Sequence, residues 1–134
     1  MSDSRNKDVI TRFISEVWNE NNLVVLDELI DHAYYDYSYD PRNREGLERT
    51  LLMMQTAFPN HETVIEEIVG EDDTVAVCLT LRGIHSGPFR GLPVYDKHFE
   101  IGGYRFFKVK DGKIISHRAL LDLPSLLEQI RTSS

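Results

Sequence analysis

The sequence has almost none of the features that tie a chain to a membrane or to disulfide chemistry. Cys78 is its only cysteine, so no intrachain disulfide can form. No apolar run is long enough to cross a bilayer. The polar residues 1–7 lack the apolar core of a signal peptide. We therefore expect a cytoplasmic protein in a reducing compartment, without a membrane partner.

Basic residues and ligand-binding motifs are also scarce. Lys and Arg number 15 against 22 Asp and Glu, which gives a formal charge of -7. Such a surface repels phosphate backbones and anionic lipids, so we expect no nucleic-acid partner. The five histidines are widely spaced and no glycine-rich phosphate loop is present. The sequence therefore predicts neither a metal site nor a cofactor.

The first half of the chain has the hydrophobic period of helices. The 134 residues fit one domain, residues 1–134. Apolar side chains recur every three to four residues over residues 4–22 and, more briefly, 23–30. Asn43 is a good N-cap for a third helix that ends at Pro59. The tyrosine-rich residues 31–43 are expected to form a connection between helices.

After Pro59 the period changes to two, which is typical of strands. The expected strands are residues 61–69, 74–85, 97–110 and 113–121, followed by a helical segment over 124–131. Asp111-Gly112 indicates a hairpin, and Gly102-Gly103 a bulge or strong bend. The expected fold is α+β: three N-terminal helices packed in a strongly curved antiparallel sheet, with a short C-terminal helix. A cone of this kind encloses an apolar pocket at its open end.

Four segments resemble one family. His85 to Pro93, followed by Lys97, resembles the H-x-G-x-F-x-G-[IL]-P-P-x-x-[KR] signature of SnoaL-like polyketide cyclases. Residues 13–19 are similar to the family's F-Y-x-E-V-W-N helix, residues 111–114 to its D-G-K-I hairpin, and residues 117–129 to its ending. The resemblance implies the cone-shaped barrel shared with nuclear transport factor and ketosteroid isomerase. It also implies cofactor-free aldol ring closure on polyketide esters.

Three departures from the family's pattern would border the mouth of the pocket. Arg118 stands where the family usually has Trp, and Tyr37 where it often has His. Val94-Tyr95 replaces the usual Pro-Thr. The substrate therefore need not be a polyketide.

Asp122 is the first candidate catalytic residue, because it matches the family's acid/base aspartate in position. A carboxyl group whose pKa is raised by an apolar cavity can both remove and return a proton. The alternative is structural, since Asp two residues before Pro124 is also an ordinary helix N-cap.

His117 is the second catalytic candidate. It could shuttle a proton, bind the substrate carbonyl or orient Asp122; the alternative is a strand histidine with a satisfied partner. The candidates for substrate contact are Tyr37, Trp18, His85, Phe89, His98, Tyr104 and Arg118. The alternatives are that His85 only fixes its loop, that Tyr37 packs the rim or a dimer contact, and that Arg118 and Arg105 are paired arginines rather than groups that bind an acidic ligand.

Three functions are compatible with these residues. The first is a cofactor-independent cyclase or isomerase-type lyase that acts on a small hydrophobic ligand, aromatic or carbonyl-containing. The second is a non-catalytic ligand-binding protein on the same fold. The more distant third is an isomerase or an epoxide hydrolase, for which Asp122 with Glu100 is the available carboxylate pair. The outer face of the sheet needs cover, so we expect a homodimer.

Overall fold

The computed structural model describes the backbone of residues 2–132 and the side chains of residues 4–132. The helical segments are α1 (Ser2–Arg12), the π-helical η1 (Phe13–Asn19) that continues it, η2 (Leu23–Val25), α2 (Leu26–Leu29), α3 (Arg44–Ala57) and α4 (Leu123–Ile130). The strands are β1 (Ile30–Asp36), β2 (Glu62–Glu71), β3 (Thr74–His85), β4 (Lys97–Lys110) and β5 (Lys113–Leu121). The α+β class and the curved sheet are confirmed. No helix among the described residues combines the length and the apolar character needed to span a bilayer.

The sheet has five strands in the order β1-β5-β4-β3-β2. β2 to β5 form an antiparallel meander, whereas β1 pairs with β5 in parallel. Two expectations were therefore wrong: residues 31–43 contain a strand, and the sheet is mixed rather than wholly antiparallel. The apolar pattern does not reveal this strand, because one of its inward positions is the charged Asp36.

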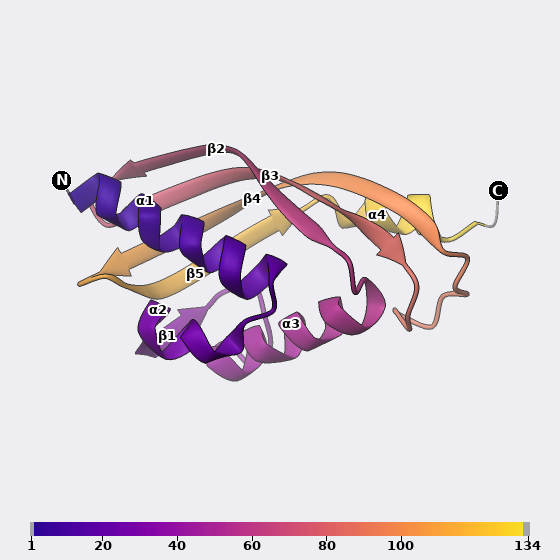
Figure 1. The fold of residues 1–134 in the computed structure, drawn as a ribbon, viewed down its shortest axis with the longest axis horizontal. Coiled ribbons are helices and arrows are strands. Elements are labelled where there is room, and N and C mark those ends of the chain that lie inside the picture. Colours follow the sequence, from indigo (N-terminus) through magenta and orange to yellow (C-terminus); the bar gives the residue numbers. More distant parts are fainter. Residues whose placement is uncertain (1, 133–134) are drawn as a thin grey trace.

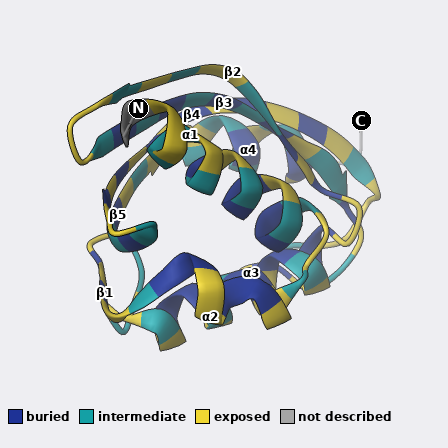
Figure 2. Cartoon of the chain, turned by 60° about the vertical axis from the view of Figure 1, so that its left-hand side comes forward, coloured by how far each residue is buried: buried dark blue, intermediate teal, exposed yellow. Residues whose placement is uncertain are grey.

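Figure 1 shows the sheet curving over α1 and α3, which cover its concave side, while α4 lies against the far end of β4. Figure 2 shows buried and exposed residues alternating along the strands and buried residues on the helices toward the interior. Along β4 burial alternates at every residue, with odd-numbered side chains inward. Phe107 of β4 meets Phe13 of η1 edge to face, with 5.9 Å between ring centroids. The core therefore lies between the sheet and the helices.

Two local signals of the sequence had different outcomes. The Asp111-Gly112 hairpin is confirmed, with φ of 52° and 78°, as a tight primed turn requires. The bulge expected at Gly102-Gly103 is not there, since β4 keeps continuous register with β3 across both glycines. The register shifts lie instead between Ile65 and Glu67, between Lys108 and Val109, and, in the β1–β5 pair, between Ile30 and Tyr35. Gly103 serves a close approach, because a Cβ there would overlap the Leu121 side chain.

Candidate functional site

Five polar side chains gather at one place on the largely apolar concave face. We call Tyr34, Asp36, Tyr39, Arg105 and His117 the interior polar cluster. Asp36 is fully buried, and His117, Arg105 and Tyr34 are 2%, 3% and 4% exposed. β1 and β5 set Asp36 opposite His117 in their parallel register, and Arg105 comes from the neighbouring β4. The cluster therefore depends on three strands.

Asp36 and His117 form a buried dyad. His117 Nδ1 lies 3.2 Å from both carboxylate oxygens of Asp36. Tyr34 Oη donates to Asp36 Oδ2 at 2.5 Å, and the Ser38 N–H donates to Oδ1 at 2.9 Å. Three donors thus hold the carboxylate, which makes it an acceptor for the His117 Nδ1–H and fixes the ring orientation.

Arg105 contacts the other nitrogen of His117. Its Nη1 lies 3.1 Å from His117 Nε2 and donates to Tyr39 Oη at 2.8 Å. Its guanidinium carbon lies 4.3 Å from the centre of the Trp18 ring. Because Arg105 can only donate, His117 Nε2 accepts, and the imidazole is neutral with its proton on Nδ1.

The surroundings explain these charge states. Burial lowers the pKa of His117, and the nearby Arg105 cation lowers it further, against the raising effect of Asp36. Burial alone would raise the pKa of Asp36, but the hydrogen bonds from His117, Tyr34 and Ser38 outweigh it, so the pKa is lowered. Burial also raises the pKa of Tyr34, which keeps its proton and donates. At neutral pH the cluster holds one carboxylate, one neutral imidazole and one guanidinium.

Asp122 lies outside this cluster. It is exposed at the N-cap of α4, where Oδ1 accepts from the Ser125 N–H at 3.1 Å. The apolar surroundings expected for its carboxyl group are therefore not found. The bond to Ser125 is the one that a helix N-cap makes. Five residues of extended chain, about 16 Å at 3.3 Å per residue, separate Asp122 from His117. His117 accordingly orients on Asp36 and not on Asp122.

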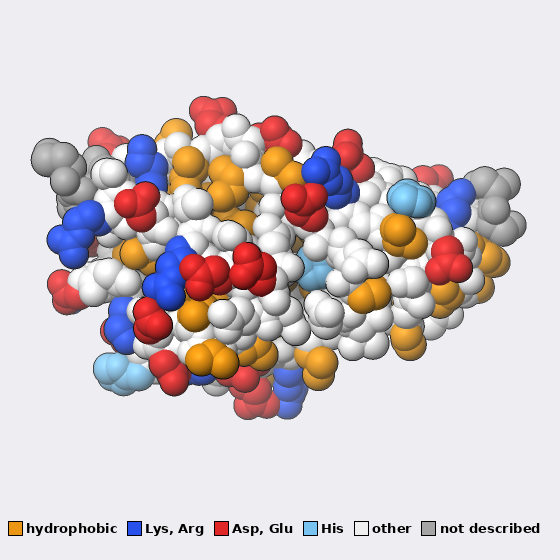
Figure 3. Space-filling view, viewed as in Figure 1, with side chains coloured by type: hydrophobic (Ala, Val, Ile, Leu, Met, Phe, Trp, Pro, Cys, Tyr) orange, Lys and Arg blue, Asp and Glu red, His pale blue; other side chains and the backbone are white. Residues whose placement is uncertain are grey.

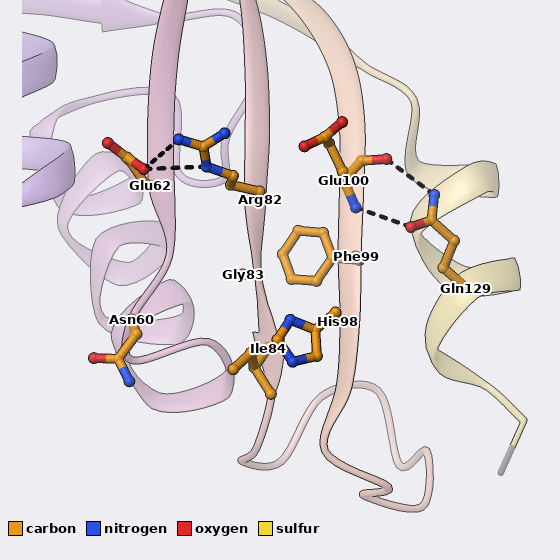
Figure 4. A pocket seen from close by; sticks show the side chains of 9 residues that line it. All are labelled: Asn60, Glu62, Arg82, Gly83, Ile84, His98, Phe99, Glu100 and Gln129. Atoms are coloured by element: carbon orange, nitrogen blue, oxygen red, sulfur yellow. Dashed lines mark hydrogen bonds and ion pairs between the residues drawn. The ribbon is translucent and has the colours of Figure 1, made fainter. Parts of the chain in front are cut away.

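Four predicted contact residues face outward. Tyr37 and Tyr104 are 42% and 62% exposed. Arg118 lies over the Tyr37 ring at 3.7 Å, on the outer side of β5. His98 is exposed and lines a groove of about 560 Å³ beside α4 (Figure 4). Tyr104 and His98 face outward because the alternation of β4 turns even-numbered residues away from the core.

Some polar groups of the outer groove are paired within the groove. Arg82 pairs with Glu62 at 2.9 Å, and the Gln129 amide bonds the backbone N–H and C=O of Glu100 (Figure 4). His98 lies beside Ile84 of β3. Glu100 faces outward here, and Asp122 lines a different hollow of the outer face. The groove thus shares no residue with the interior polar cluster.

His85 and Phe89 belong to a second interior group, which is aromatic. Both pack against Phe58, with ring centroids 5.9 and 5.1 Å away. His85 is fully buried, and among the described residues neither of its ring nitrogens has a hydrogen-bond partner. The loop is held by other bonds, since the Ser86 and Gly87 N–H groups donate to the Ala57 carbonyl at 3.0 and 3.1 Å. Among the described residues, the His85 ring therefore adds no hydrogen bond to those that hold the loop.

Two predicted residues, Trp18 and His117, do lie together in the interior, and their neighbours Asp36 and Tyr39 were missed. Arg105, taken in the sequence as a paired or ligand-binding arginine, is a member of the cluster. The inward direction of the Arg105 side chain can be predicted from the sequence, because Arg105 lies an even number of residues from the core residues Phe107 and Val109 on the same strand. A charged residue at an inward position is expensive, which makes it a signal of function.

The fold and the interior polar cluster together define a class: cone-shaped α+β proteins with buried titratable groups on the concave side of the sheet. The chain belongs to the SnoaL-like polyketide cyclase family, whose model matches residues 8–130. No curated protein matches the chain.

Solved structures are similar over almost the whole chain. IdmH, a candidate polyketide cyclase from Streptomyces antibioticus, is 29% identical with a TM-score of 0.84, over 92% of this chain and 96% of that one. A candidate SnoaL-like polyketide cyclase from Jannaschia sp. CCS1 is 23% identical with a TM-score of 0.87, over 97% and 94%. AclR, a candidate hydroxylase from Streptomyces galilaeus, is 20% identical with a TM-score of 0.85, over 94% and 95%. The last two likenesses concern the fold alone.

Proposed function

We propose that this chain is a cofactor-free acid/base enzyme that acts on a small carbonyl compound, with His117 as the group that moves the proton. The observation that carries the proposal is the buried dyad, in which Asp36 holds the Nδ1–H of a neutral His117. A neutral imidazole in a desolvated site is a base at physiological pH. The proposal replaces Asp122 by His117 as the proton carrier, because Asp122 is exposed and already caps α4.

The cluster supplies the parts that an aldol closure or an isomerisation needs. His117 Nε2 removes the proton next to the carbonyl, once Arg105 Nη1 turns from Nε2 toward the carbonyl oxygen. Arg105 and Tyr39 then stabilise the enolate oxygen, and Asp36 stabilises the imidazolium that has formed. The imidazolium returns its proton to the alkoxide or to carbon. Proton removal next to a carbonyl is common to the whole reaction class.

That shared step can be tested without the natural substrate. 2-Tetralone is an apolar ketone whose C1 protons exchange in D2O, and NMR follows the exchange. We expect the wild-type protein to accelerate exchange above the buffer rate, and the His117→Asn variant to fall to the buffer rate while its circular dichroism is unchanged. His32→Asn is the control, since the His32 side chain is 96% exposed. Equal exchange by wild type and His117→Asn would contradict the proposal, as would no acceleration by the wild type.

Asp122 gives a prediction of its own. Asp122→Asn should keep both the exchange rate and the stability, because an asparagine oxygen can still accept from the Ser125 N–H. Asp122→Ala should lose about 1 kcal/mol of unfolding free energy, as removal of a helix N-cap does. Urea unfolding and the exchange assay measure both. If Asp122→Asn folds normally but no longer exchanges, the acid/base role belongs to Asp122 after all.

One observation favours the ligand-binding alternative. Both ring nitrogens of His117 already have partners within the protein, which is also what a purely structural histidine needs. Native mass spectrometry distinguishes the two functions: a ligand that copurifies and is recovered unchanged after long incubation supports binding without catalysis.

We also propose that the outer face of the sheet pairs with a second copy of the chain. Val69, Tyr104, Phe106 and Leu120 are 53%, 62%, 44% and 76% exposed on this face. They line a hollow of about 400 Å³ with Ala76 and Cys78. In the view of Figure 3, acidic and basic side chains are mixed over the surface. Adjacent exposed apolar side chains are typical of protein interfaces.

Substitution of Leu120 by lysine is expected to separate the dimer, because its charge would be buried in an apolar interface. Light scattering at micromolar concentration should give twice the chain mass of 15.5 kDa for the wild type and the single mass for Leu120→Lys. Leu52→Lys is the matched control, since Leu52 of α3 is 68% exposed on the helical side. A monomeric wild type, or a dimeric Leu120→Lys, would rule this interface out.

A further inference from the structure

We infer that Arg105 of the interior polar cluster and Trp18, stacked on it, bind a carboxylate of the ligand through Arg105 Nε and Trp18 Nε1. The inference rests on the proposed function and narrows its substrate to a small aromatic or apolar carbonyl compound that is also an acid, such as an aryl keto acid. It comes from donors that the fold buries without acceptors.

The first observation is that Arg105 lacks a counter-ion. Its side chain is 3% exposed, and among the described residues no carboxylate lies within 4.0 Å of its guanidinium nitrogens. Its contacts are neutral: Tyr39 Oη, His117 Nε2 and the Trp18 ring. The one carboxylate of the cluster, Asp36, is on the far side of His117 and occupied by three donors. A buried guanidinium is expensive unless an anion accompanies it.

The second observation is that unused N–H groups gather around this cation. Arg105 Nε and Trp18 Nε1 are both buried, and neither has a hydrogen-bond partner in the described part of the chain. The two side chains are stacked, with 4.3 Å between the guanidinium carbon and the ring centre. A buried donor left without an acceptor costs free energy comparable to a lost hydrogen bond. Two such donors on touching side chains fit an acceptor that arrives with the ligand.

His61 belongs to the same neighbourhood. It is 7% exposed, and its Nδ1 has no partner among the described residues. Burial and, next, the positive charge of Arg105 lower the pKa of His61. An anion bound at Arg105 would offset that charge. His61 thus adds a third unpartnered polar atom within the field of Arg105.

The chemistry of the ligand follows from these groups. A planar guanidinium edge with an adjacent indole N–H matches a carboxylate, which accepts two bonds in a plane. The rings of Trp18, Tyr39 and Phe107 surround His117 and Arg105, which favours an apolar or aromatic body. Tyr39 is the most exposed member of the cluster and is therefore the side from which a ligand can enter.

Trp18, the only tryptophan of the chain, reports on this site directly. The test titrates the full-length protein with benzoate and with its neutral isostere benzamide, and follows Trp18 fluorescence. We expect benzoate to bind at least about tenfold more tightly than benzamide, and inorganic phosphate to produce no saturable change. In Arg105→Gln the preference should disappear, whereas in Arg105→Lys, which keeps the charge but not the planar edge, it should be reduced. Arg82→Gln, on the outer face, should leave it unchanged.

A second measurement covers the case in which Arg105→Gln does not fold. In wild-type protein, benzoate should shift the single indole N–H resonance and one arginine Nε–H resonance in the same titration, and benzamide should not. Equal effects of benzoate and benzamide, or a preference that survives in folded Arg105→Gln, would overturn the inference. His117→Asn separates it from the proposed function: this variant should lose exchange on 2-tetralone and keep the benzoate preference.

Discussion

Replacement of Asp36 by asparagine is expected to lower the rate of carbonyl proton exchange by about 10²- to 10⁴-fold, the range that a positioned acid/base group contributes. The loss should appear in turnover more than in ligand binding. Asp36 touches no ligand in this proposal; it is a positioning residue that acts through His117 Nδ1.

The physical reason is the tautomer of His117. The Asp36 carboxylate only accepts, so the proton of the imidazole stays on Nδ1 and Nε2 is left as the base. An asparagine amide can present its NH2 group to Nδ1 and so move the proton to Nε2. The Nε2–H would then face Arg105 Nη1, which also donates and lies 3.1 Å away. His117 Nε2 could then no longer accept a proton, and two N–H donors would face each other in a buried site.

The exchange assay and urea unfolding together test this prediction. Asp36→Asn should also lose stability, because breaking a buried charged network costs about 3–5 kcal/mol. Asp31→Asn on the same strand is the matched control, since an asparagine oxygen can still accept from the Ala33 N–H. A folded Asp36→Asn that exchanges at the wild-type rate would show that the tautomer of His117 does not matter, and the dyad would be only structural.

How far the sequence predicts the fold depends on how regular each element's burial is. The bounds of β3, β4 and β5 were predicted to the residue, because their inward and outward side chains alternate. β1 was missed for the opposite reason: its inward positions are Ile30, Tyr34 and the charged Asp36. Asp36, the charged residue that interrupts the apolar pattern of β1, is also the residue that orients His117.

The candidate site was less predictable than the fold because it depends on pairing between distant segments. Asp36 and His117 are 81 residues apart, and only the parallel register of β1 and β5 brings them together. Nothing in one sequence specifies that a strand next to a helix will pair with the last strand. The position of Asp122 in a motif carries no information on its exposure, whereas its N-cap geometry before Pro124 can be predicted from the local sequence.

Replacement of Phe58 by alanine is expected to destabilise the fold by about 3–5 kcal/mol, the cost of deleting a fully buried aromatic side chain. Phe58 is the C-cap residue of α3, and its ring contacts His85 at the end of β3, Phe89 of the following loop and Phe99 of β4. Its removal leaves a cavity under the loop that carries the family signature.

The Phe58 prediction separates packing from hydrogen bonding as the force that holds this loop. The His85 ring has no hydrogen-bond partner among the described residues, so its position depends on the aromatic group around Phe58. Urea unfolding, followed by Trp18 fluorescence at one protein concentration, measures the change. Leu52→Ala on the same helix, at a site 68% exposed, should change stability by less than about 0.5 kcal/mol. If Phe58→Ala costs no more than this control, the aromatic group is dispensable and the two backbone hydrogen bonds to Ala57 alone hold the loop.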